Sequence, residues 1–189
     1  MIEIKVPLSK LISPGFNQLH HDIWEDKYDE YWLRGGRGST KSTFVSIQII
    51  MTILKDPNAN AVITRRYQTL LRNTVYGQMI WTIEKMGLTS EFRFLVSPMQ
   101  ITFIRTGQKI AFMGADDPTK IKSINLGRGY IKIAWFEELS EFSGPEELRN
   151  IIQSLLRGED DHKRISFYSF NPPKSARSWV NAESKIPKP

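Results

Sequence analysis

The stretch Trp32–Thr43, WLRGGRGSTKST, places three glycines, two arginines and a lysine directly in front of an apolar segment. The residues YWL at 31–33 predict a short strand, and STFVSIQIIMTIL at 42–54 predicts a helix that is apolar nearly all round. A glycine-rich turn between a strand and a buried helix directs backbone N–H groups and the positive end of the helix to one point. Core packing does not require that combination, so the stretch predicts a phosphate-binding loop.

Counted from Gly35, the loop matches G-x-x-x-x-G-K-S at every fixed position except the second glycine, where Thr40 stands. We expect Thr40 to keep a negative φ, because a β-branched residue resists positive φ. Lys41 is predicted to reach the outer phosphates of a nucleotide, and the Ser42 hydroxyl to ligate magnesium. The predicted nucleotide-binding residues of this stretch are Gly35, Gly36, Gly38, Ser39, Thr40, Lys41, Ser42 and Thr43. The alternative interpretation is a glycine turn with solvated charges.

A second strand is predicted within YIKIAWFEELSEF at 130–142, and its apolar run stops at Glu137 and Glu138. Open α/β sheets bind ligands at the carboxyl ends of their strands, so we expect both acids to lie in the same crevice as the loop. Glu137 is predicted to hold magnesium through water, and Glu138 to orient and polarise an attacking water. The alternative is that both acids simply begin a helix, where the helix dipole favours them.

Between the loop and these acids, the pattern continues as strand, helix and then a meander. Residues 61–64 predict a buried strand, and apolar residues at steps of three and four predict a helix over 71–86. The period changes to two across residues 92–113, which predicts an inserted antiparallel meander. The 97 positions from Lys41 to Glu138 leave room for an intervening strand, for which residues 61–64 are the candidate.

After the acids, residues 143–146 predict a capping box that opens a helix running to Gly158, and residues 164–170 predict a last strand. Asn171 ends that strand at the same edge, where it either senses the terminal phosphate or is only a polar strand end. We therefore predict an α/β fold: a P-loop NTPase of the additional-strand, catalytic-glutamate type, with a mainly parallel sheet flanked by helices and the inserted meander.

The chain has 189 residues, which suits a single domain, and its net charge of +6 is compatible with a polyanionic partner. It has no cysteine, which excludes a disulfide framework and a thiolate zinc site and favours a reducing compartment. The three histidines lack the HExxH spacing of a zinc enzyme. We find no signal-peptide pattern and no membrane span, so we expect a soluble, intracellular protein.

Four stretches follow one another from Trp32 to Pro173: WLRGGRGSTKS, VITRRYQTLLRNTVYGQ, IAFMGADDPTKIKSI leading on to IAWFEELSEF, and SFNPP. Together they make the chain resemble the ATPase domain of a tailed-phage terminase large subunit, close to the PBSX-like branch. The resemblance implies a motor that hydrolyses ATP with Mg²⁺ to drive double-stranded DNA into a preformed capsid. It also implies a homo-oligomeric ring in the host cell cytoplasm, at the procapsid portal, with the portal protein and the terminase small subunit as partners.

The resemblance implies roles for six residues. Arg37 would couple ATP binding to movement, and Arg128 would be supplied to the site of a neighbouring subunit. Gln18 is the candidate for contacting adenine, although an exposed polar position on a helix explains it equally well. Asn171 fits the motif that couples hydrolysis to domain movement. Lys120 and Lys122 lie in the connector-like stretch DDPTKIKSI and either contact DNA or a neighbour or are simply solvated.

The sequence departs from the family pattern at Thr40, at Glu137, where aspartate is more usual, and after Asn171, where no acidic cluster for a nuclease follows. We therefore expect no nuclease activity, and interpret the chain as an excised ATPase domain or the product of a truncated or split gene. We expect residues 1–173 to form the ATPase domain and residues 174–189 a basic, proline-containing tail, either a linker or disordered. That tail could follow a DNA backbone, or its charge could only keep it in solution.

Two other functions fit the same residues. One is a different nucleic-acid motor of the same class, such as a helicase-like ATPase. The other is a nucleotide-binding assembly module with little turnover, in which ATP only stabilises one conformation and the departures at Thr40 and Glu137 mark lost activity. Phosphate release by Glu138→Gln compared with the unchanged chain separates the second from an ATPase.

Overall fold

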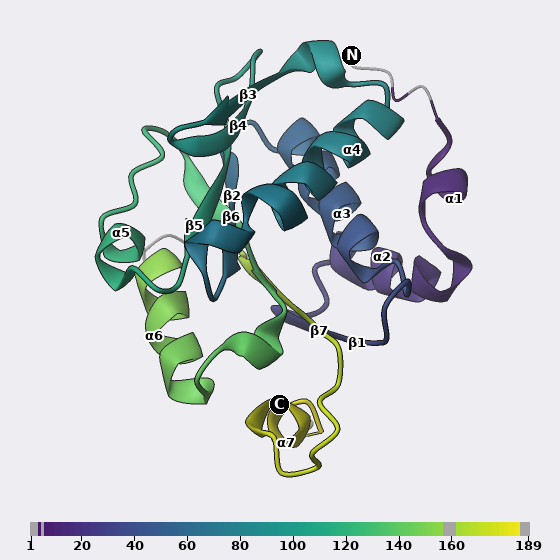
Figure 1. Cartoon of the computed structure of the whole chain (residues 1–189). Coiled ribbons are helices and arrows are strands. Elements are labelled where there is room, and N and C mark those ends of the chain that lie inside the picture. Colours follow the sequence, from purple (N-terminus) through teal and green to yellow (C-terminus); the bar gives the residue numbers. More distant parts are fainter. Residues whose placement is uncertain (1–3, 5, 157–161, 186–189) are drawn as a thin grey trace.

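The centre of the computed structural model, which describes residue 4, residues 6–156 and residues 162–185, is a seven-stranded sheet (Figure 1). Its strands are β1 (Glu30–Arg34), β2 (Ala59–Arg65), β3 (Phe92–Val96), β4 (Met99–Phe103), β5 (Lys109–Gly114), β6 (Tyr130–Glu137) and β7 (Ile165–Phe170). They lie in the order β1-β7-β6-β2-β5-β4-β3. The first five run parallel to one another, and β4 and β3 continue the sheet antiparallel. The expected α/β class with a mainly parallel sheet is thus confirmed.

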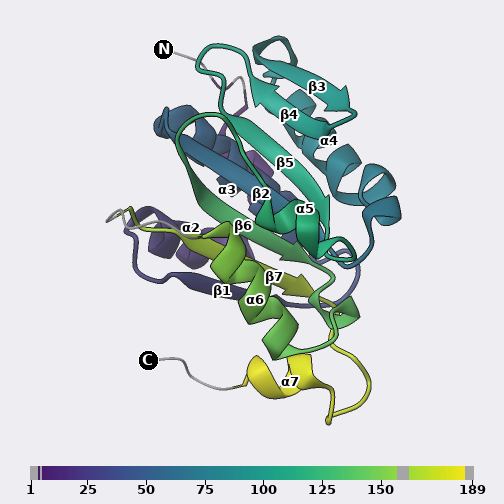
Figure 2. The same cartoon turned by 90° about the vertical axis from the view of Figure 1, so that its left-hand side faces the viewer.

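Helices cover both faces of the sheet (Figures 1 and 2). The helices are α1 (Leu8–Leu11), α2 (Asn17–Trp24), α3 (Lys41–Lys55), α4 (Gly77–Lys85), α5 (Pro118–Lys122), α6 (Pro145–Leu155) and α7 (Trp179–Glu183). Short 3₁₀ segments are η1 (Pro14–Phe16), η2 (Gln68–Leu70), η4 (Thr89–Glu91) and η5 (Leu139–Glu141), and η3 (Arg72–Tyr76) is a π-helix. The elements α2, α3 and α4 lie on one face, and α5 and α6 on the other. Among the described residues, none of the helices combines the length and apolar character that a membrane span needs.

Alternating side chains of the central strands supply two cores. In β6, Ile133 and Trp135 enter the core under α3 and α4, whereas Ala134 and Phe136 enter the core under α6. Because successive side chains of a strand point to opposite faces, a strand buried on both faces must be apolar at every position. That requirement explains the continuous apolar run IAWF, and it places the end of β6 between two helical layers.

The strand between the loop strand and the acidic strand differs from the expectation. The predicted strand, residues 61–64, belongs to β2, which lies on the far side of β6. The strand that separates β1 from β6 is β7, which pairs in parallel with both. The additional strand of the predicted class is therefore the last strand of the chain, and its end at Asn171 falls between the loop and the acids.

The helix predicted over residues 71–86 is interrupted. Its first part is the π-helix Arg72–Tyr76, in which the Tyr76 N–H donates to the Leu71 carbonyl at 3.0 Å, five residues back. The Thr74 hydroxyl donates to the Leu70 carbonyl at 2.6 Å and thus satisfies a carbonyl of this irregular turn. Regular α-helix begins only at Gly77, so the apolar periodicity predicted the buried face but not the local widening.

The capping box predicted at residues 143–146 is also wrong in detail. The N-cap of α6 is Gly144, which makes no side-chain cap, and the Ser143 N–H instead donates to the Glu147 carboxylate at 2.7 Å. Proline at 145 is the first helical residue, where its missing N–H costs nothing. The predicted end at Gly158 lies outside the described residues, and α6 ends at Leu155.

The segment after Asn171 is more ordered than expected. Residues 179–183 form α7, where Val180 is fully buried in the core beneath α6 and the Trp179 indole N–H donates to the Phe142 carbonyl at 2.9 Å. This segment is rich in charged residues and proline, but its apolar residues Trp179 and Val180 are enough to pack one short helix against the core. The prediction of a linker or disordered tail is therefore wrong for residues 179–183. Residues 186–189 lie outside the described residues. The domain boundary at residue 173 stays a prediction.

Candidate nucleotide-binding site

The predicted loop and the predicted acids lie together at the carboxyl ends of β1, β7 and β6. They enclose a hollow of about 320 Å³. Its lining residues are Gly36, Arg37, Gly38, Ser39, Thr40, Lys41, Ser42, Thr43, Gln78, Glu137, Glu138, Ser169, Phe170 and Asn171. The Gly35 N–H donates to the Phe170 carbonyl at 3.2 Å, which joins the start of the loop to the end of β7. A crevice lined by a glycine loop on one side and two acids on the other fits a polyphosphate with its metal ion.

The Lys41 ammonium lies inside the loop. It donates to the carbonyls of Gly35 at 2.7 Å and Gly36 at 3.1 Å, and to the Ser39 hydroxyl at 2.8 Å. Partial burial lowers the pKa of Lys41, while the carboxylates of the two acids oppose that shift. The ammonium is thus placed at the point where the loop backbone and the start of α3 converge.

Thr40 has φ +58° and ψ +14°, which is the left-handed region, so the expectation of a negative φ is wrong. The residue directly before α3 must turn the chain into the helix, which is the reason the pattern places glycine there. Its carbonyl accepts the first helical hydrogen bond, from the Phe44 N–H at 2.9 Å. The strain of a β-branched residue in this region is of order 1–3 kcal/mol, and the rest of the fold offsets it.

Asn171 connects the lysine with the second acid. Its side-chain N–H donates to Glu138 Oε1 at 3.0 Å, and its Oδ1 accepts from Lys41 Nζ at 3.5 Å. One amide side chain therefore contacts both the ammonium expected at the phosphates and the carboxylate expected at the attacking water. This connection is possible only because β7 lies between β1 and β6.

Glu138 also has a left-handed backbone, with φ +52° and ψ +53°. It follows the last residue of β6 and caps η5, where its carbonyl accepts from the Glu141 N–H at 2.8 Å. Non-glycine residues rarely adopt this conformation, and such residues cluster at functional sites. Thr40 and Glu138 are two of the three non-glycine residues with positive φ in the described chain, and they lie on opposite walls of one hollow.

Glu137 is mostly buried and pairs with an arginine that the sequence reasoning missed. Arg65 Nε lies 3.1 Å from Glu137 Oε2, and Arg65 also donates to Glu141 Oε1 at 2.8 Å. Burial raises the pKa of Glu137 to about 7, and the Arg65 guanidinium opposes that rise. The sequence shows that the apolar strand 61–64 runs directly into a charged residue. It does not show which strand lies beside this one, so it cannot identify the partner of Arg65.

The comparison with known families decides the identity. Residues 29–184 match the family described as phage terminase large subunit. The chain belongs to that family. It is 37% identical over 179 residues to the terminase large subunit of Bacillus phage SPP1, covering 94% of this chain and 42% of that protein. It is 35% identical over 141 residues to the PBSX phage terminase large subunit of Bacillus subtilis, covering 74% of this chain and 30% of that protein. The chain thus spans less than half the length of these relatives.

Solved terminase structures share the fold. The large terminase of the HK97 bacteriophage superposes with a TM-score of 0.62 at 12% identity, over 84% of this chain and 33% of that one. The N-terminal domain of the DNA packaging ATPase from bacteriophage phi29 superposes with a TM-score of 0.58 at 17% identity, over 85% and 79%. At these identities the likeness shows the P-loop fold of terminase ATPase domains, while site roles depend on the residues of this chain.

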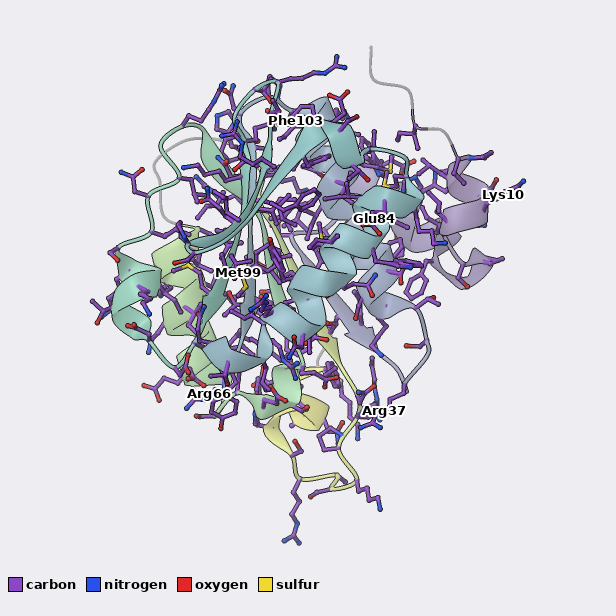
Figure 3. All side chains as sticks on the ribbon, turned by 45° about the horizontal axis from the view of Figure 1, so that its top comes forward. Lys10, Arg37, Arg66, Glu84, Met99 and Phe103 are labelled. Atoms are coloured by element: carbon purple, nitrogen blue, oxygen red, sulfur yellow. The ribbon has the colours of Figure 1, made fainter. Side chains whose placement is uncertain are left out.

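Three of the other residues singled out in the terminase-like sequence lie at the site. Ser42 and Thr43 line the hollow from the first turn of α3, and the exposed Arg37 lines it from the loop. Figure 3 shows Arg37 at the same end of the molecule as Arg66. Gln78, which the sequence reasoning also missed, reaches the hollow from α4, where it donates to Thr43 Oγ1 at 3.4 Å. No sequence pattern near Gln78 would have identified it, because only the packing of α4 on α3 brings it there.

The structure does not bring Gln18 and Arg128 to this hollow. The exposed Gln18 side chain donates to Asp22 at 2.9 Å on α2. Arg128 lies two residues before the start of β6, at the opposite end of the strand from Glu138, and donates to the carbonyls of Thr106 and Pro57. Within one molecule neither residue is placed to contact a nucleotide bound at the loop.

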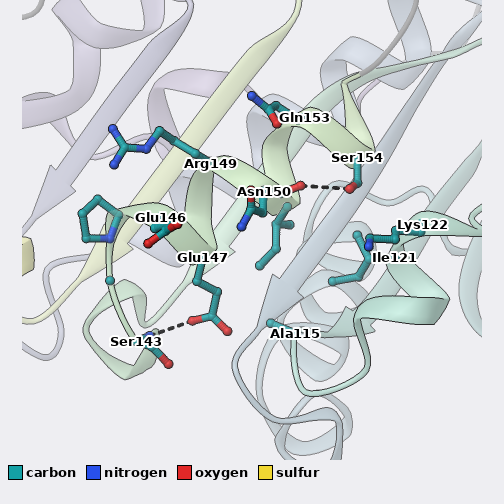
Figure 4. Close-up of a pocket in the computed structure, with 13 residues that line it drawn as sticks. Ala115, Ile121, Lys122, Ser143, Glu146, Glu147, Arg149, Asn150, Gln153 and Ser154 are labelled. Atoms are coloured by element: carbon teal, nitrogen blue, oxygen red, sulfur yellow. Dashed lines mark hydrogen bonds between the residues drawn. The ribbon is translucent and has the colours of Figure 1, made fainter.

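A larger hollow lies elsewhere, between α5 and α6 (Figure 4). Its volume is about 1170 Å³, and Ile121, Lys122, Glu147 and Asn150 are among the side chains that line it. It contains none of the loop residues or the acids at the end of β6. Size alone does not indicate function, so the smaller hollow with convergent charged groups remains the candidate site.

Proposed function

We propose that this chain binds ATP at the loop 35–43 and hydrolyses it, with Glu138 as the residue that orients and activates the attacking water. The observation that carries this proposal is the hydrogen-bonded connection from Lys41 through Asn171 to Glu138. A group bound between the loop and the acids would contact a cation for its phosphates and, opposite, a carboxylate for the water.

Phosphate binding depends on the loop and the start of α3. The helix has 15 residues, so its N-terminus presents unpaired N–H groups and a partial positive charge toward the loop. The Lys41 ammonium now donates to neutral carbonyls of the loop, and a phosphate oxygen is a stronger, charged acceptor. Binding of a triphosphate would therefore draw the ammonium from Gly35 and Gly36 toward the hollow.

The reaction step depends on Glu138. Its carboxylate is oriented by the Asn171 amide, which leaves the second carboxylate oxygen to accept a proton from water. Because the same amide contacts Lys41, displacement of the ammonium by the terminal phosphate would change the position of Asn171. A change in the bound nucleotide would thus move Asn171, and with it the segment that follows β7.

Magnesium fits the residues at the site. Among the described residues, no cluster of three or more His, Cys, Asp or Glu side chains could hold a metal ion alone. The Ser42 hydroxyl and the Glu137 carboxylate line the hollow, and Mg²⁺ usually binds through few protein oxygens together with substrate phosphates. When bound, the ion neutralises charge that develops on the transferred phosphoryl group. The residues that would hold it here are Ser42 directly and Glu137 through water.

The family resemblance extends the proposal to a DNA-packaging motor. In such a ring, Arg37 would couple nucleotide binding to movement from its exposed place on the loop. Arg128 could serve only the site of a neighbouring subunit, because the whole of β6, eight residues or about 26 Å long, separates it from Glu138. Gln18 as an adenine contact stays a prediction, as do Lys120 and Lys122 as contacts to DNA or a neighbour.

The proposed partners are double-stranded DNA, the portal protein and the terminase small subunit, at the procapsid portal in the host cell cytoplasm. The net charge of +6 supports binding to a polyanion without base recognition. We expect duplex binding that weakens steeply with salt and does not depend on sequence. Equal affinity at low and high salt, or no binding at low salt, would contradict this part. The absence of nuclease activity stays a prediction, tested by incubating supercoiled plasmid with the chain and Mg²⁺.

The decisive experiment measures phosphate release at rising protein concentration, with and without duplex DNA. Lys41→Ala is expected to abolish nucleotide binding, and Glu138→Gln to keep binding while losing turnover. The matched controls are Lys10→Ala and Glu84→Gln, because both residues are exposed and lie away from the loop (Figure 3). Turnover that rises more than linearly with protein would indicate a site completed by a neighbour. Equal phosphate release from Glu138→Gln and the unchanged chain would instead favour a passive assembly module.

A further inference from the structure

The end of β2 brings an arginine against the acids at the end of β6. These strands are parallel neighbours, and the pairing of Thr64 with Phe136 places the next residues, Arg65 and Glu137, beside each other. Arg65 Nε lies 3.1 Å from Glu137 Oε2, and Arg65 Nη2 donates to Glu141 Oε1 at 2.8 Å. One guanidinium therefore contacts two carboxylates that lie on either side of Glu138 in the sequence.

These contacts are made mostly away from solvent. The side chains of Arg65 and Glu137 are only 8% and 13% exposed, and that of Glu141 is 31% exposed. A buried charge is strongly destabilising unless it is paired, and here the arginine compensates for carboxylates that would otherwise repel one another. The pairing is thus a requirement of the acid cluster and not an incidental surface ion pair.

The geometry uses a property that only arginine has. Its planar guanidinium spreads the positive charge over Nε and both terminal nitrogens, so that Nη2 donates to Glu141 while the Nε edge lies within ion-pair distance of Glu137, without a hydrogen bond from Nε to Oε2. A lysine at the same place carries one compact ammonium and cannot hold both carboxylates at these positions. Retention of the charge alone is therefore insufficient.

The contacts of Arg65 with Glu137 and Glu141 affect Glu138, which lies between them in the sequence. Glu138 has the strained left-handed backbone, and such a conformation persists only where the surroundings determine it on several sides. Arg65 holds the residue before Glu138 and the residue three positions after it, and the Glu141 N–H donates to the Glu138 carbonyl at 2.8 Å. The turn that directs the Glu138 carboxylate toward Asn171 is thus held at both ends by one side chain.

We infer that Arg65 is a positioning residue of the ATPase site, which keeps Glu138 in its working orientation by holding Glu137 and Glu141. The inference rests on the proposed hydrolysis of ATP. It assigns Arg65 no contact with the nucleotide, so its removal should act on turnover and leave nucleotide binding nearly unchanged. A displacement of about 1 Å at a catalytic group can cost about 100-fold in rate.

The test compares Arg65→Lys with Arg66→Lys. Arg66 is the next residue along the chain and pairs with Glu147 at the start of α6, outside the hollow, so it controls for loss of an arginine ion pair. For Arg65→Lys we expect kcat to fall about 10- to 100-fold, with KM and the affinity for a fluorescent ATP analogue within about threefold of the unchanged chain. For Arg66→Lys we expect all three to stay within about threefold.

A second variant keeps the test decisive if Arg65→Lys folds poorly. Glu141→Gln removes one charge that Arg65 holds at a partly exposed position, and we expect kcat to fall about 3- to 10-fold with binding unchanged. Because both changes act through one contact, the double variant should lose less than the product of the single losses. Circular dichroism confirms that each variant is folded.

Three outcomes would overturn the inference. The first is an Arg65→Lys protein with unchanged kcat, and the second is one that loses ATP-analogue affinity as strongly as Lys41→Ala does. The third is a double variant whose losses multiply. Failure of the proposed function is recognised separately, because the unchanged chain would then release no phosphate that depends on Glu138, whatever residue stands at position 65.

Discussion

The side chains of Asn171 and Glu138, which are 33 residues apart in sequence, meet in a hydrogen bond of 3.0 Å at the carboxyl ends of β7 and β6. The bond joins the end of β7, the strand beside the loop strand, to the end of the acidic strand. It depends on the parallel pairing of β7 with β6, in which Glu137 lies opposite Ser169, so that the residues that follow both strands emerge side by side. Since Lys41 also contacts Asn171, this amide is the centre of the candidate site.

Replacement of Asn171 by aspartate is expected to impair turnover. The new carboxylate cannot donate to Glu138 and would repel it, while still attracting Lys41, so we expect kcat to fall about 10- to 100-fold. Steady-state phosphate release checks the fall, and a fluorescent ATP analogue checks binding. Asn150→Asp, at an exposed position on α6, is the matched control and should behave as the unchanged chain. An Asn171→Asp protein with full turnover would remove the amide from the mechanism.

Replacement of Thr40 by glycine is expected to stabilise the fold. Relief of the left-handed strain contributes about 1–2 kcal/mol, and the extra freedom of glycine in the unfolded chain offsets about 0.5–1 kcal/mol of it. The net gain in unfolding free energy is therefore about 0.5–1 kcal/mol, measured by urea denaturation. Thr52→Gly, within α3, should destabilise by about 0.3 kcal/mol through helix propensity, because that position is helical. Equal destabilisation by both changes would contradict the positive φ at Thr40.

The stability of the protein should fall as pH rises toward neutrality because of Glu137. Burial raises its pKa from 4.5 to about 7, so between these values the folded chain holds a proton that the unfolded chain has lost. The stabilisation is complete below about pH 4.5 and is lost as pH rises through 7. Glu137→Gln cannot ionise there, so the unfolding free energy of the unchanged chain should fall relative to that of the variant. Parallel curves from about pH 4.5 to about 7.5 would show that Glu137 is ionised throughout.

Removal of the Trp179 side chain is expected to loosen the end of the chain. Its indole N–H donates to the Phe142 carbonyl, and the ring joins the apolar residues under α6, so Trp179→Ala should lower the unfolding free energy by about 2–3 kcal/mol. Trp81→Ala is the matched control, since Trp81 is 45% exposed, and should change stability by less than about 1 kcal/mol. Thermal or urea unfolding measures both. Equal losses would mean that α7 contributes little to the fold.

Much of the candidate site was predictable from local sequence. The glycine loop, the apolar helix after it and the strand ending at Glu137 and Glu138 each have a pattern within about a dozen residues. The rule that parallel strands bind ligands at their carboxyl ends then placed Asn171 at the same edge. These predictions agree with the structure because hydrophobic periodicity reports which face of each element is buried, whatever its neighbours are.

Other features depended on contacts between distant segments. Arg65 pairs with Glu137 across 72 positions and Gln78 reaches Thr43 across 35, and no local pattern identifies either partner. The predicted strand beside the loop strand is wrong for the same reason, because strand order is set by how layers pack and not by order along the chain.

The sequence by itself determined the strands, the helix after the loop, their buried faces and the chemistry available at their ends, but not α7 or the π-helical turn at 72–76. Only the tertiary structure decided that β7 lies between β1 and β6, that Arg128 lies at the opposite edge, and that Thr40 adopts a positive φ. The physical reason is that propensity and periodicity act over a few residues. The energy that holds Thr40 in a strained conformation, by contrast, comes from the packing of α3 and the loop against the whole sheet.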